Sequence, residues 1–285
     1  MKKTRYALIF AVLLILSTTY SCSKEKNNSS FDVAEMESVN SDAFNEELII
    51  PIGEDSISGY ALIASGNNLK ETVILIQGYP GNDTNFDIGQ DIRENGKNVI
   101  LFHHRGAWGS QGVYSYSNCL NDIKEIVRFL TQDEMSSKLR IKTDDFTLMG
   151  RSFGGGIALI EGSRIKSVKR IIAISTVNYG VIMKKYNSID ELGSFKRYMQ
   201  DQIMINHDID DFLQELLDKR EEYNIADYSD ELKAKKVLLI EESDKNEDWI
   251  SQMENIEYLI IDSDHDFVNE RSKLQSTILN WLENR

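Results

Sequence analysis

The stretch LMGRSFGGG, residues 148–156, decides how this chain can fold. It contains the pattern G-x-S-x-G, with Ser152 standing between Gly150 and Gly154. An apolar, strand-like run precedes the pattern, and a helix-like run at residues 157–160 follows it. This order is what a nucleophile elbow requires, because the serine must stand on a sharp strand-to-helix turn with glycines where neighbouring backbone comes close. A glycine-rich turn with an ordinary serine is the alternative, and the rest of the chain must decide between the two.

Apolar runs alternate with helical patterns along the rest of the chain. Strands are predicted at residues 46–52, 60–64, 72–76, 98–102, 146–149, 168–175, 237–240 and 258–261. Helices are predicted at residues 85–94, 120–130 and 267–282. The first two strands are expected to pair antiparallel. Later strands that alternate with helices predict an α/β fold, with a mostly parallel sheet flanked by helices on both faces.

The interval from Tyr179 to Ala234 breaks this alternation. It is polar, acidic and prone to form helices. Its apolar residues recur at helical spacings: Met183, Tyr186, Phe195, Met199, Ile203, Phe212 and Leu216. We interpret residues 179–234 as a small helical cap inserted between two strands of the core. A long disordered loop is the alternative, and the apolar content disfavours it.

Composition excludes one class of partner. The chain has 285 residues, 41% of them hydrophobic, and a formal net charge of −14. That length suits one large α/β domain or two small ones. Nucleic-acid binding needs basic surface, so the acidic excess argues against a nucleic-acid partner. Only Cys22 and Cys119 are present, which leaves no disulfide framework, and Cys119 is expected to be a small core residue.

The amino terminus resembles a secretory signal. Lys2, Lys3 and Arg5 form a positive region before the uninterrupted apolar run at residues 7–16. That run is too short to span a bilayer as a helix and fits the hydrophobic part of a signal peptide. We therefore expect residues 1–21 to be removed.

The residue after this segment is Cys22, and a cysteine here resembles a bacterial lipoprotein signal. In such signals the cysteine becomes the lipidated first residue of the mature chain. Ser21 before it is acceptable, whereas Thr19 stands where leucine is usual. The resemblance implies a protein anchored by lipid in the bacterial cell envelope, in the periplasm or at the cell surface, with residues 22–44 as a flexible tether. Ordinary secretion with an incidental cysteine is the alternative.

A serine hydroxyl becomes a good nucleophile when a base removes its proton, and that base is usually a histidine oriented by a carboxylate. Of the four histidines, His265 follows a predicted buried strand and precedes the last helix. This position faces the carboxyl edge of the sheet, where the elbow also lies. Asp244, just after the predicted strand at residues 237–240, supplies the carboxylate.

The order Ser152, Asp244, His265 resembles the α/β-hydrolase fold family, over about residues 45–285. QGYPGN at residues 77–82 looks like the family's His-Gly-x-x-Gly loop. RGAWGSQG at residues 105–112 looks like its Arg-Gly-x-Gly-x-Ser-x-Gly loop, with a tryptophan at the second glycine. SDHDF at residues 263–267 resembles the segment around the family's catalytic histidine.

The resemblance implies a role for each candidate. Ser152 would attack an acyl carbonyl, His265 would accept its proton and pass it to the leaving group, and Asp244 would orient the imidazole. The backbone N–H groups of Tyr79 and Phe153 would bind the oxyanion. No cofactor and no metal is implied, and the expected substrate is a small-molecule or peptide acyl compound.

Two departures from the family pattern matter. Gln77 replaces the usual histidine of its loop, and we expect altered loop packing there with no loss of chemistry. Glu241 and Glu242 stand where the family often has a glycine, so either could replace Asp244 as the group that orients His265.

The other polar candidates have plainer interpretations. His103 and His104 end a strand beside the active edge, where packing or hydrogen bonding is expected of them. His207, among acidic neighbours in the cap, is interpreted as part of a solvated face. Arg151 either lies at the surface or faces the cleft toward an anionic substrate.

The sequence thus predicts a serine hydrolase that acts on an ester, a thioester or an amide. A small serine peptidase related to the prolyl-oligopeptidase group is one alternative. A non-catalytic envelope protein that binds ligands on a hydrolase scaffold is another, because fold alone does not fix function.

Overall fold

The computed structural model describes residues 41–82 and 85–284. The expected signal peptide, Cys22 and most of the expected tether lie outside these residues. In the described part, no helix combines the length and the apolar character needed to cross a bilayer.

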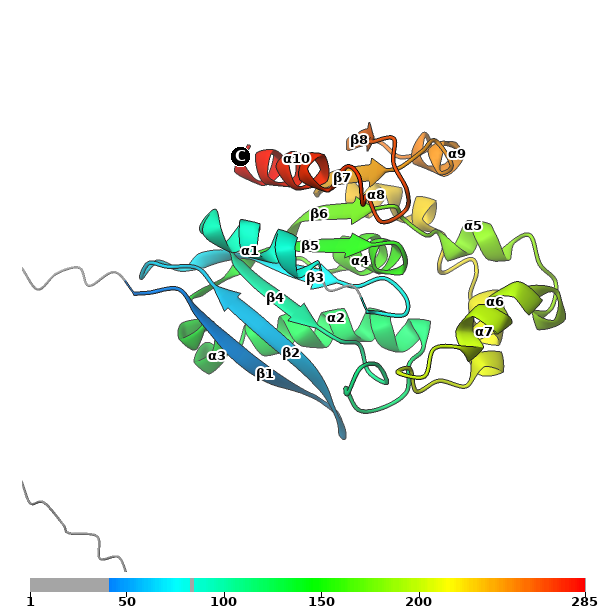
Figure 1. The fold of residues 1–285 in the computed structure, drawn as a ribbon, viewed down its shortest axis with the longest axis horizontal. Coiled ribbons are helices and arrows are strands. Elements are labelled where there is room, and N and C mark those ends of the chain that lie inside the picture. The colour runs from blue at the N-terminus through cyan, green and yellow to red at the C-terminus, as the bar shows by residue number, and fades with distance from the viewer. Residues whose placement is uncertain (1–40, 83–84, 285) are drawn as a thin grey trace, which may run out of the picture. The chain divides into compact units, whose positions relative to one another are not determined.

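One mixed sheet forms the centre of the described residues (Figure 1). Its eight strands are β1 (Phe44–Ile52), β2 (Asp55–Ile63), β3 (Lys70–Ile76), β4 (Asn98–Phe102), β5 (Ile141–Arg151), β6 (Val168–Ile174), β7 (Lys236–Glu241) and β8 (Ile256–Ile260). Their spatial order is β1-β2-β4-β3-β5-β6-β7-β8. The β1–β2 and β2–β4 pairs are antiparallel, and the remaining pairs are parallel.

The central strands are buried because helices cover both faces of the sheet. All five residues of β4 are buried, as are the last seven residues of β5. Strands that are buried without interruption are expected where helices cover both faces of a sheet. After β3 the chain adds β4 on one side of that strand and then crosses back to add β5 on its other side. The direction in which successive strands are added therefore reverses beside β3. Ligands of open α/β sheets bind at the carboxyl ends of the strands at such a point.

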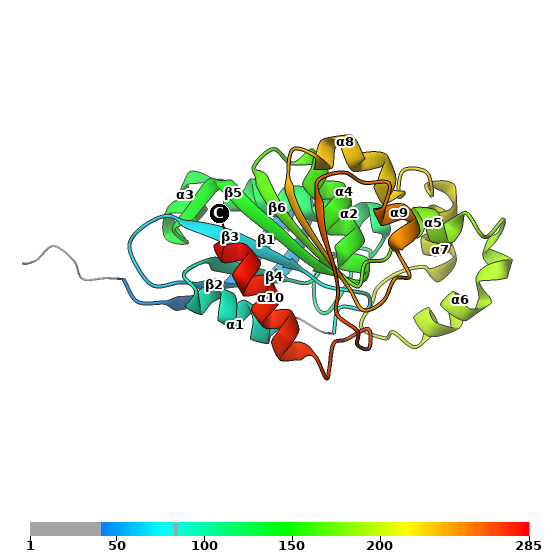
Figure 2. The same cartoon turned by 90° about the horizontal axis from the view of Figure 1, so that it is seen from above.

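The helices form two layers (Figures 1 and 2). On one face, α1 (Phe86–Glu94) and α10 (Arg271–Glu283) bury apolar side chains in one cluster with residues of β2 to β7. On the other face, α2 (Tyr116–Leu130) and α4 (Phe153–Arg164) pack in the larger part of the core. The α/β class, with its mostly parallel sheet and helices on both sides, is confirmed.

The chain between β6 and β7 is largely helical and lies beyond the carboxyl ends of the central strands (Figure 1). Its elements are α5 (Tyr179–Met183), η2 (Ile189–Leu192), α6 (Gly193–Gln200), α7 (Ile209–Asp218), η3 (Ile225–Tyr228) and α8 (Ser229–Leu232). We call residues 179–234 the cap.

A short seam of main-chain hydrogen bonds fastens the cap to the core. The N–H of Trp108 donates to the carbonyl of Met204 (3.0 Å), and that of Asn206 donates to the carbonyl of Gly106 (2.6 Å). The N–H of Tyr114 in turn donates to the carbonyl of Asn206 (2.8 Å). The cap therefore rests on the loop between β4 and α2.

Some elements differ from the sequence-based expectation. Two short helices, α3 (Asp133–Lys138) and α9 (Glu247–Ile250), have no sustained apolar periodicity and were not expected. The last helix begins at Arg271, because the segment expected to be its first turn forms the loop that carries His265.

Candidate active site

Ser152 stands on a strained turn between β5 and α4. Its backbone has φ 55° and ψ −117°, a conformation that costs a non-glycine residue about 1–3 kcal/mol. Hydrogen bonds on both sides hold it there: the Ser152 N–H donates to the carbonyl of Ile174 (2.8 Å), and its carbonyl accepts from the N–H of Val177 (3.1 Å). The elbow that the G-x-S-x-G pattern predicts is therefore present, with the serine side chain at the edge of the sheet.

The glycines around Ser152 are required by close backbone contacts. A Cβ atom on Gly150 would lie 2.0 Å from the carbonyl oxygen of Gly154. A Cβ atom on Gly154 would lie 2.3 Å from the carbonyl oxygen of Ile76 in β3. Both distances are far below van der Waals contact, so a side chain at either position would force the turn apart.

His265 is held in the loop between β8 and α10. The carboxylate of Asp264 accepts hydrogen bonds from the N–H groups of Asp266 (2.9 Å) and Val268 (3.2 Å). Phe267, which is completely buried, anchors the same loop in the core. The imidazole between these anchors is nearly half exposed, at 46% of its side-chain surface.

The carboxylate beside His265 belongs to Glu242. Its Oε1 lies 3.3 Å from His265 Nδ1, and its Oε2 accepts a hydrogen bond from the hydroxyl of Ser175 (2.7 Å). Lys245 forms an ion pair with the same side chain. Burial alone would raise the pKa of Glu242, but the hydrogen bonds from His265, Lys245 and Ser175 outweigh it and hold the pKa well below its usual range. Glu242 is therefore ionised at neutral pH.

Asp244 does not take the position expected of it. Strand β7 ends at Glu241, so Glu242 is the first residue beyond the sheet edge and reaches His265. Asp244 lies in the following turn, is exposed, and accepts the N–H of Glu247 with its carbonyl as α9 begins (3.0 Å). In the described residues no hydrogen bond joins Asp244 to His265, and of the carboxylates left open by the sequence, the geometry favours Glu242.

Glu241 has a structural position instead. Its side chain is fully buried and accepts hydrogen bonds from the N–H of Thr176 (2.8 Å) and the amide of Asn246 (2.9 Å). Burial raises the pKa of Glu241 to about 7 despite these bonds. This carboxyl group ties the ends of β6 and β7 together directly behind Glu242.

The two backbone donors expected to bind an oxyanion lie beside Ser152. A Cβ atom on Gly78 would lie 3.4 Å from Ser152 Cβ, so the loop that carries Tyr79 runs against the serine. Phe153 is the first residue of α4, at the positive end of the helix dipole. Neither the N–H of Tyr79 nor that of Phe153 donates to any acceptor in residues 41–82 and 85–284. Both remain available to a ligand.

Ser152 and His265 line one cavity of about 500 Å³ between the sheet edge and the cap. Tyr79 and Phe153 line it as well. Across the residues described, no hydrogen bond joins Ser152 Oγ to His265, and such bonds are often long until a substrate is bound. The cavity has the size of a small-molecule site, and its lining brings together a serine, an imidazole and two residues whose N–H groups have no acceptor among the described residues.

A family model described as "alpha/beta hydrolase fold" matches residues 71–273, which is most of the chain. The chain belongs to the α/β-hydrolase fold family. No curated protein matches the sequence.

Several solved structures resemble this α/β-hydrolase fold protein. An esterase from Pyrococcus furiosus has a TM-score of 0.60 at 17% identity, over 85% of this chain and 91% of its own. Est1E from Butyrivibrio proteoclasticus, solved with ferulic acid bound, has a TM-score of 0.65 at 13% identity, over 82% of this chain and 97% of its own. A dienelactone hydrolase from Anabaena variabilis has a TM-score of 0.56 at 14% identity, over 85% and 98%. At these identities the likeness concerns the fold.

Arg151, the residue before Ser152 in this α/β-hydrolase fold protein, lines the cavity and is buried. Its guanidinium forms an ion pair with Asp266 and donates to the carbonyl of His265 (3.3 Å). Of the two interpretations left open by the sequence, the structure shows a residue at the cleft. Asp266 and Ser175, which steady the histidine loop and Glu242, carried no sequence signal that distinguished them.

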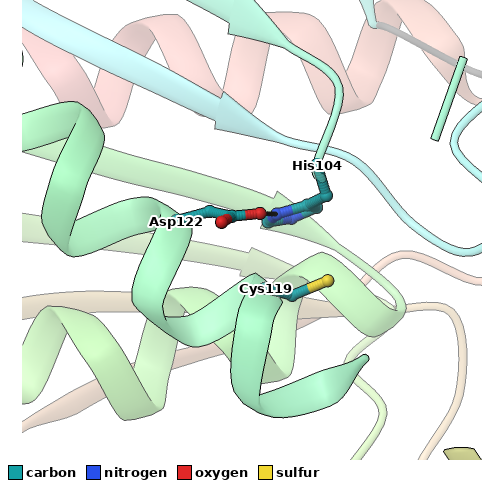
Figure 3. Close-up of side chains that lie close together, drawn as sticks. All are labelled: His104, Cys119 and Asp122. Carbon is teal, nitrogen blue, oxygen red and sulfur yellow. Dashed lines mark hydrogen bonds and ion pairs between the residues drawn. The ribbon is translucent and has the colours of Figure 1, made fainter. Parts of the chain in front are cut away.

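His104, Cys119 and Asp122 form a buried cluster whose ligand atoms lie within 4.8 Å of one another (Figure 3). Asp122 accepts hydrogen bonds from His104 Nδ1 (3.1 Å) and Arg105 Nε (2.6 Å), and burial raises the pKa of the Cys119 thiol. A protonated thiol and a carboxylate already paired with a guanidinium make a poor cation site. The cluster fixes the loop after β4, as expected of His104, and Cys119 is the expected core residue.

His207 is not part of a solvated face, so that interpretation was wrong. Its Nε2 lies 3.1 Å from the hydroxyl of Tyr79, and its ring packs 6.2 Å from that of Phe212. Burial lowers the pKa of His207. His207 of the cap thus contacts Tyr79 in the loop after β3. The pattern of charges around His207 in the sequence cannot reveal this contact.

Proposed function

We propose that this protein is a serine hydrolase that cleaves a carboxylic ester, or a related thioester or amide, through an acyl-enzyme on Ser152. One observation carries the proposal: Ser152, on its strained elbow, shares a cavity with His265, and His265 Nδ1 lies 3.3 Å from Glu242. The esterase and the dienelactone hydrolase among the solved structures of similar fold are consistent with this reaction class.

The first half of the reaction forms the acyl-enzyme. Ser152 Oγ attacks the acyl carbon, and its proton passes to Nε2 of His265. The oxyanion receives hydrogen bonds from the N–H groups of Tyr79 and Phe153, each worth on the order of 3 kcal/mol in the transition state. The bond from carbon to the leaving oxygen then breaks, and His265 returns the proton to that oxygen, releasing the alcohol.

The second half uses the same groups on water. His265 takes a proton from a water molecule as it attacks the acyl-enzyme, and then delivers that proton to Ser152 Oγ as the carboxylic acid leaves. Glu242 accepts Nδ1–H throughout, which fixes the tautomer and stabilises the imidazolium. Because its pKa is low, Glu242 itself stays ionised over the whole neutral range.

Fluorophosphonate labelling, combined with turnover of short p-nitrophenyl esters, tests the proposal. Wild type should form a Ser152 adduct and hydrolyse p-nitrophenyl acetate, and Ser152→Ala should lose both. Ser137→Ala, at an exposed position on α3, is the matched control and should behave as wild type. A folded wild-type protein that is neither labelled nor active would overturn the proposal.

The same assays separate the two alternatives. A peptidase would cleave aminoacyl nitroanilides faster than the matched esters. A non-catalytic binding protein would turn over neither, yet would bind ligands equally well as wild type and as Ser152→Ala.

We also propose that the protein is exported and lipidated at Cys22, which lies outside the described residues. The support is the sequence alone: a positive region, an apolar run at residues 7–16, and a cysteine after a small residue. Metabolic labelling with an alkyne fatty acid in a bacterial host should mark the wild-type protein. Cys22→Ala should abolish the label and move the protein from the membrane fraction to the soluble fraction.

A further inference from the structure

The cavity wall beneath the cap is aromatic. Phe153 and Tyr179 lie with ring centroids 5.9 Å apart, and Phe153 and Tyr79 lie 6.4 Å apart. Phe212 of α7 packs 6.3 Å from Tyr79 and extends this wall into the cap. Of these rings, Phe153 is 1% exposed and Phe212 is 3% exposed, so both are packed behind the wall and hold it in place, while the half-buried Tyr79 lines the cavity.

A polar group interrupts this wall. The hydroxyl of Tyr179 makes no hydrogen bond to any residue that the structure describes, although the residue itself is buried. It is not enclosed in the protein interior, because Tyr179 lines the cavity and its oxygen is not among the shielded, unpartnered atoms. The hydroxyl of Tyr79 differs, because it is paired with His207. The Tyr179 hydroxyl is thus a donor and acceptor that a ligand can reach.

The two halves of an ester must occupy different sides of Ser152. The leaving oxygen takes its proton from His265, whose imidazole stands at the exposed rim of the cavity. The alcohol therefore departs on the side open to solvent. The acyl group stays bonded to Ser152 until water attacks, so on this argument it takes the enclosed side beneath the cap, along Tyr79 and Tyr179, which line the cavity.

We infer that the substrate carries an aromatic acyl group with a hydroxyl or similar polar substituent on its ring. This inference rests on the proposed function and names the substrate class of the same site. Aromatic rings gain from offset or edge-to-face contact with other rings beyond the area they bury. A saturated ring of similar size buries the same area without that gain. A cavity of about 500 Å³ accommodates such a group.

Matched methyl esters test the aromatic part. We expect kcat/KM for methyl 3-phenylpropanoate to exceed that for methyl 3-cyclohexylpropanoate by about fivefold. Benzyl acetate, which carries its ring in the alcohol, should gain no comparable advantage over cyclohexylmethyl acetate. Equal rates for the first pair, or a preference that follows the alcohol instead, would overturn the inference.

Tyr179→Phe tests the polar part, since it keeps the ring and removes only the hydroxyl. Wild type should prefer methyl 3-(4-hydroxyphenyl)propanoate, or its 3-hydroxy isomer, over the unsubstituted ester by about fivefold. Tyr179→Phe should lose that preference and keep the phenyl-over-cyclohexyl ratio. Tyr60→Phe, on β2 and outside this cavity, is the control and should keep both. A hydroxyl preference that survives in Tyr179→Phe contradicts the assignment.

Two further measurements keep this inference separate from the proposed function. Turnover of p-nitrophenyl acetate without any aromatic preference would refute the inference alone. If no ester is hydrolysed, calorimetric binding of 3-(4-hydroxyphenyl)propanoate and 3-cyclohexylpropanoate to Ser152→Ala decides it. Tighter binding of the hydroxyphenyl acid, lost in Ser152→Ala/Tyr179→Phe, supports the inference, and equal binding overturns it.

Discussion

The sheet edge and the cap meet at one cavity but are built in different ways. At the sheet edge, main-chain hydrogen bonds fix Ser152, and a hydrogen bond from Ser175 holds Glu242. In the cap, the cavity side of α6 and α7 consists of aromatic and aliphatic side chains, and Tyr198 among them is 51% exposed. Under the proposed function, the reaction would depend on the edge and the choice of substrate on the cap, so each should fail separately.

We expect the largest effect on activity from removing the negative charge of Glu242 at the sheet edge. Glu242→Gln keeps the shape of the side chain but favours the wrong imidazole tautomer, which in a related triad costs on the order of 10⁴-fold in kcat. We therefore expect kcat for p-nitrophenyl acetate to fall by about 10³- to 10⁴-fold, measured under saturating substrate.

Asp244→Asn is the matched control, because Asp244 is exposed and two residues further along the chain. Its kcat should stay close to that of wild type. If Asp244→Asn were the more damaging change, the family order predicted from sequence would hold and Glu242 would lose its proposed role.

Two glycine-to-alanine substitutions, one at the sheet edge and one in the cap, compare how well each region accommodates an added methyl group. Gly154→Ala would place a methyl group 2.3 Å from the carbonyl oxygen of Ile76, so the elbow must shift. We expect a loss of about 3 kcal/mol in the free energy of unfolding, from urea titration.

Gly193→Ala is its counterpart in the cap, at the start of α6. The added methyl group would meet only the end of Arg197, at 3.9 Å, and φ is −57°. Alanine also restricts the unfolded chain, so stability should be unchanged or rise by up to about 1 kcal/mol. Equal losses at both positions would mean that the edge is no more constrained than the cap.

The smallest expected effect is a pH dependence of the free energy of unfolding that arises from Glu242. The folded-state pKa of Glu242 lies below its ordinary value of 4.5, so its ionised form stabilises the fold. That contribution is complete above the unfolded pKa and is lost as the pH falls through the folded pKa. The stability of wild type relative to Glu242→Gln should therefore be greater near neutral pH than at about pH 3. Urea titrations at both pH values measure it, and a difference that grows on acidification would contradict this sign.

The fold could be predicted because it depends on local patterns. Continuous apolar runs marked the buried strands, and the glycines around Ser152 marked a turn whose backbone contacts exclude any side chain. The chain order of nucleophile and base placed Ser152 and His265 at the same sheet edge, and the structure has them there.

The third member of the site could not be settled in the same way. Glu241, Glu242 and Asp244 are close in sequence, and which one reaches His265 depends on the residue at which β7 ends. Sequence patterns place strand ends only to within a few residues, and a shift of one residue reverses the direction of a side chain. Ser175, which holds Glu242, looks like any serine at the end of a strand.

The cap side and the core side of the seam place different requirements on the amino-acid sequence. Three of its bonds between residues 204–206 and the core loop join main-chain atoms, which nearly every amino acid can supply. A fourth runs from the side-chain amide of Asn206 to the carbonyl of Gly112 (2.8 Å). On the core side, by contrast, Gly106 has φ 72°, and a Cβ atom there would lie 2.3 Å from the nitrogen of Tyr114. The seam thus requires glycine at position 106 and a side-chain amide at position 206, whereas Met204 contributes only its carbonyl. Substitutions elsewhere in the cap, among the residues that line the cavity, would therefore leave the bonds that hold the cap over Ser152 in place.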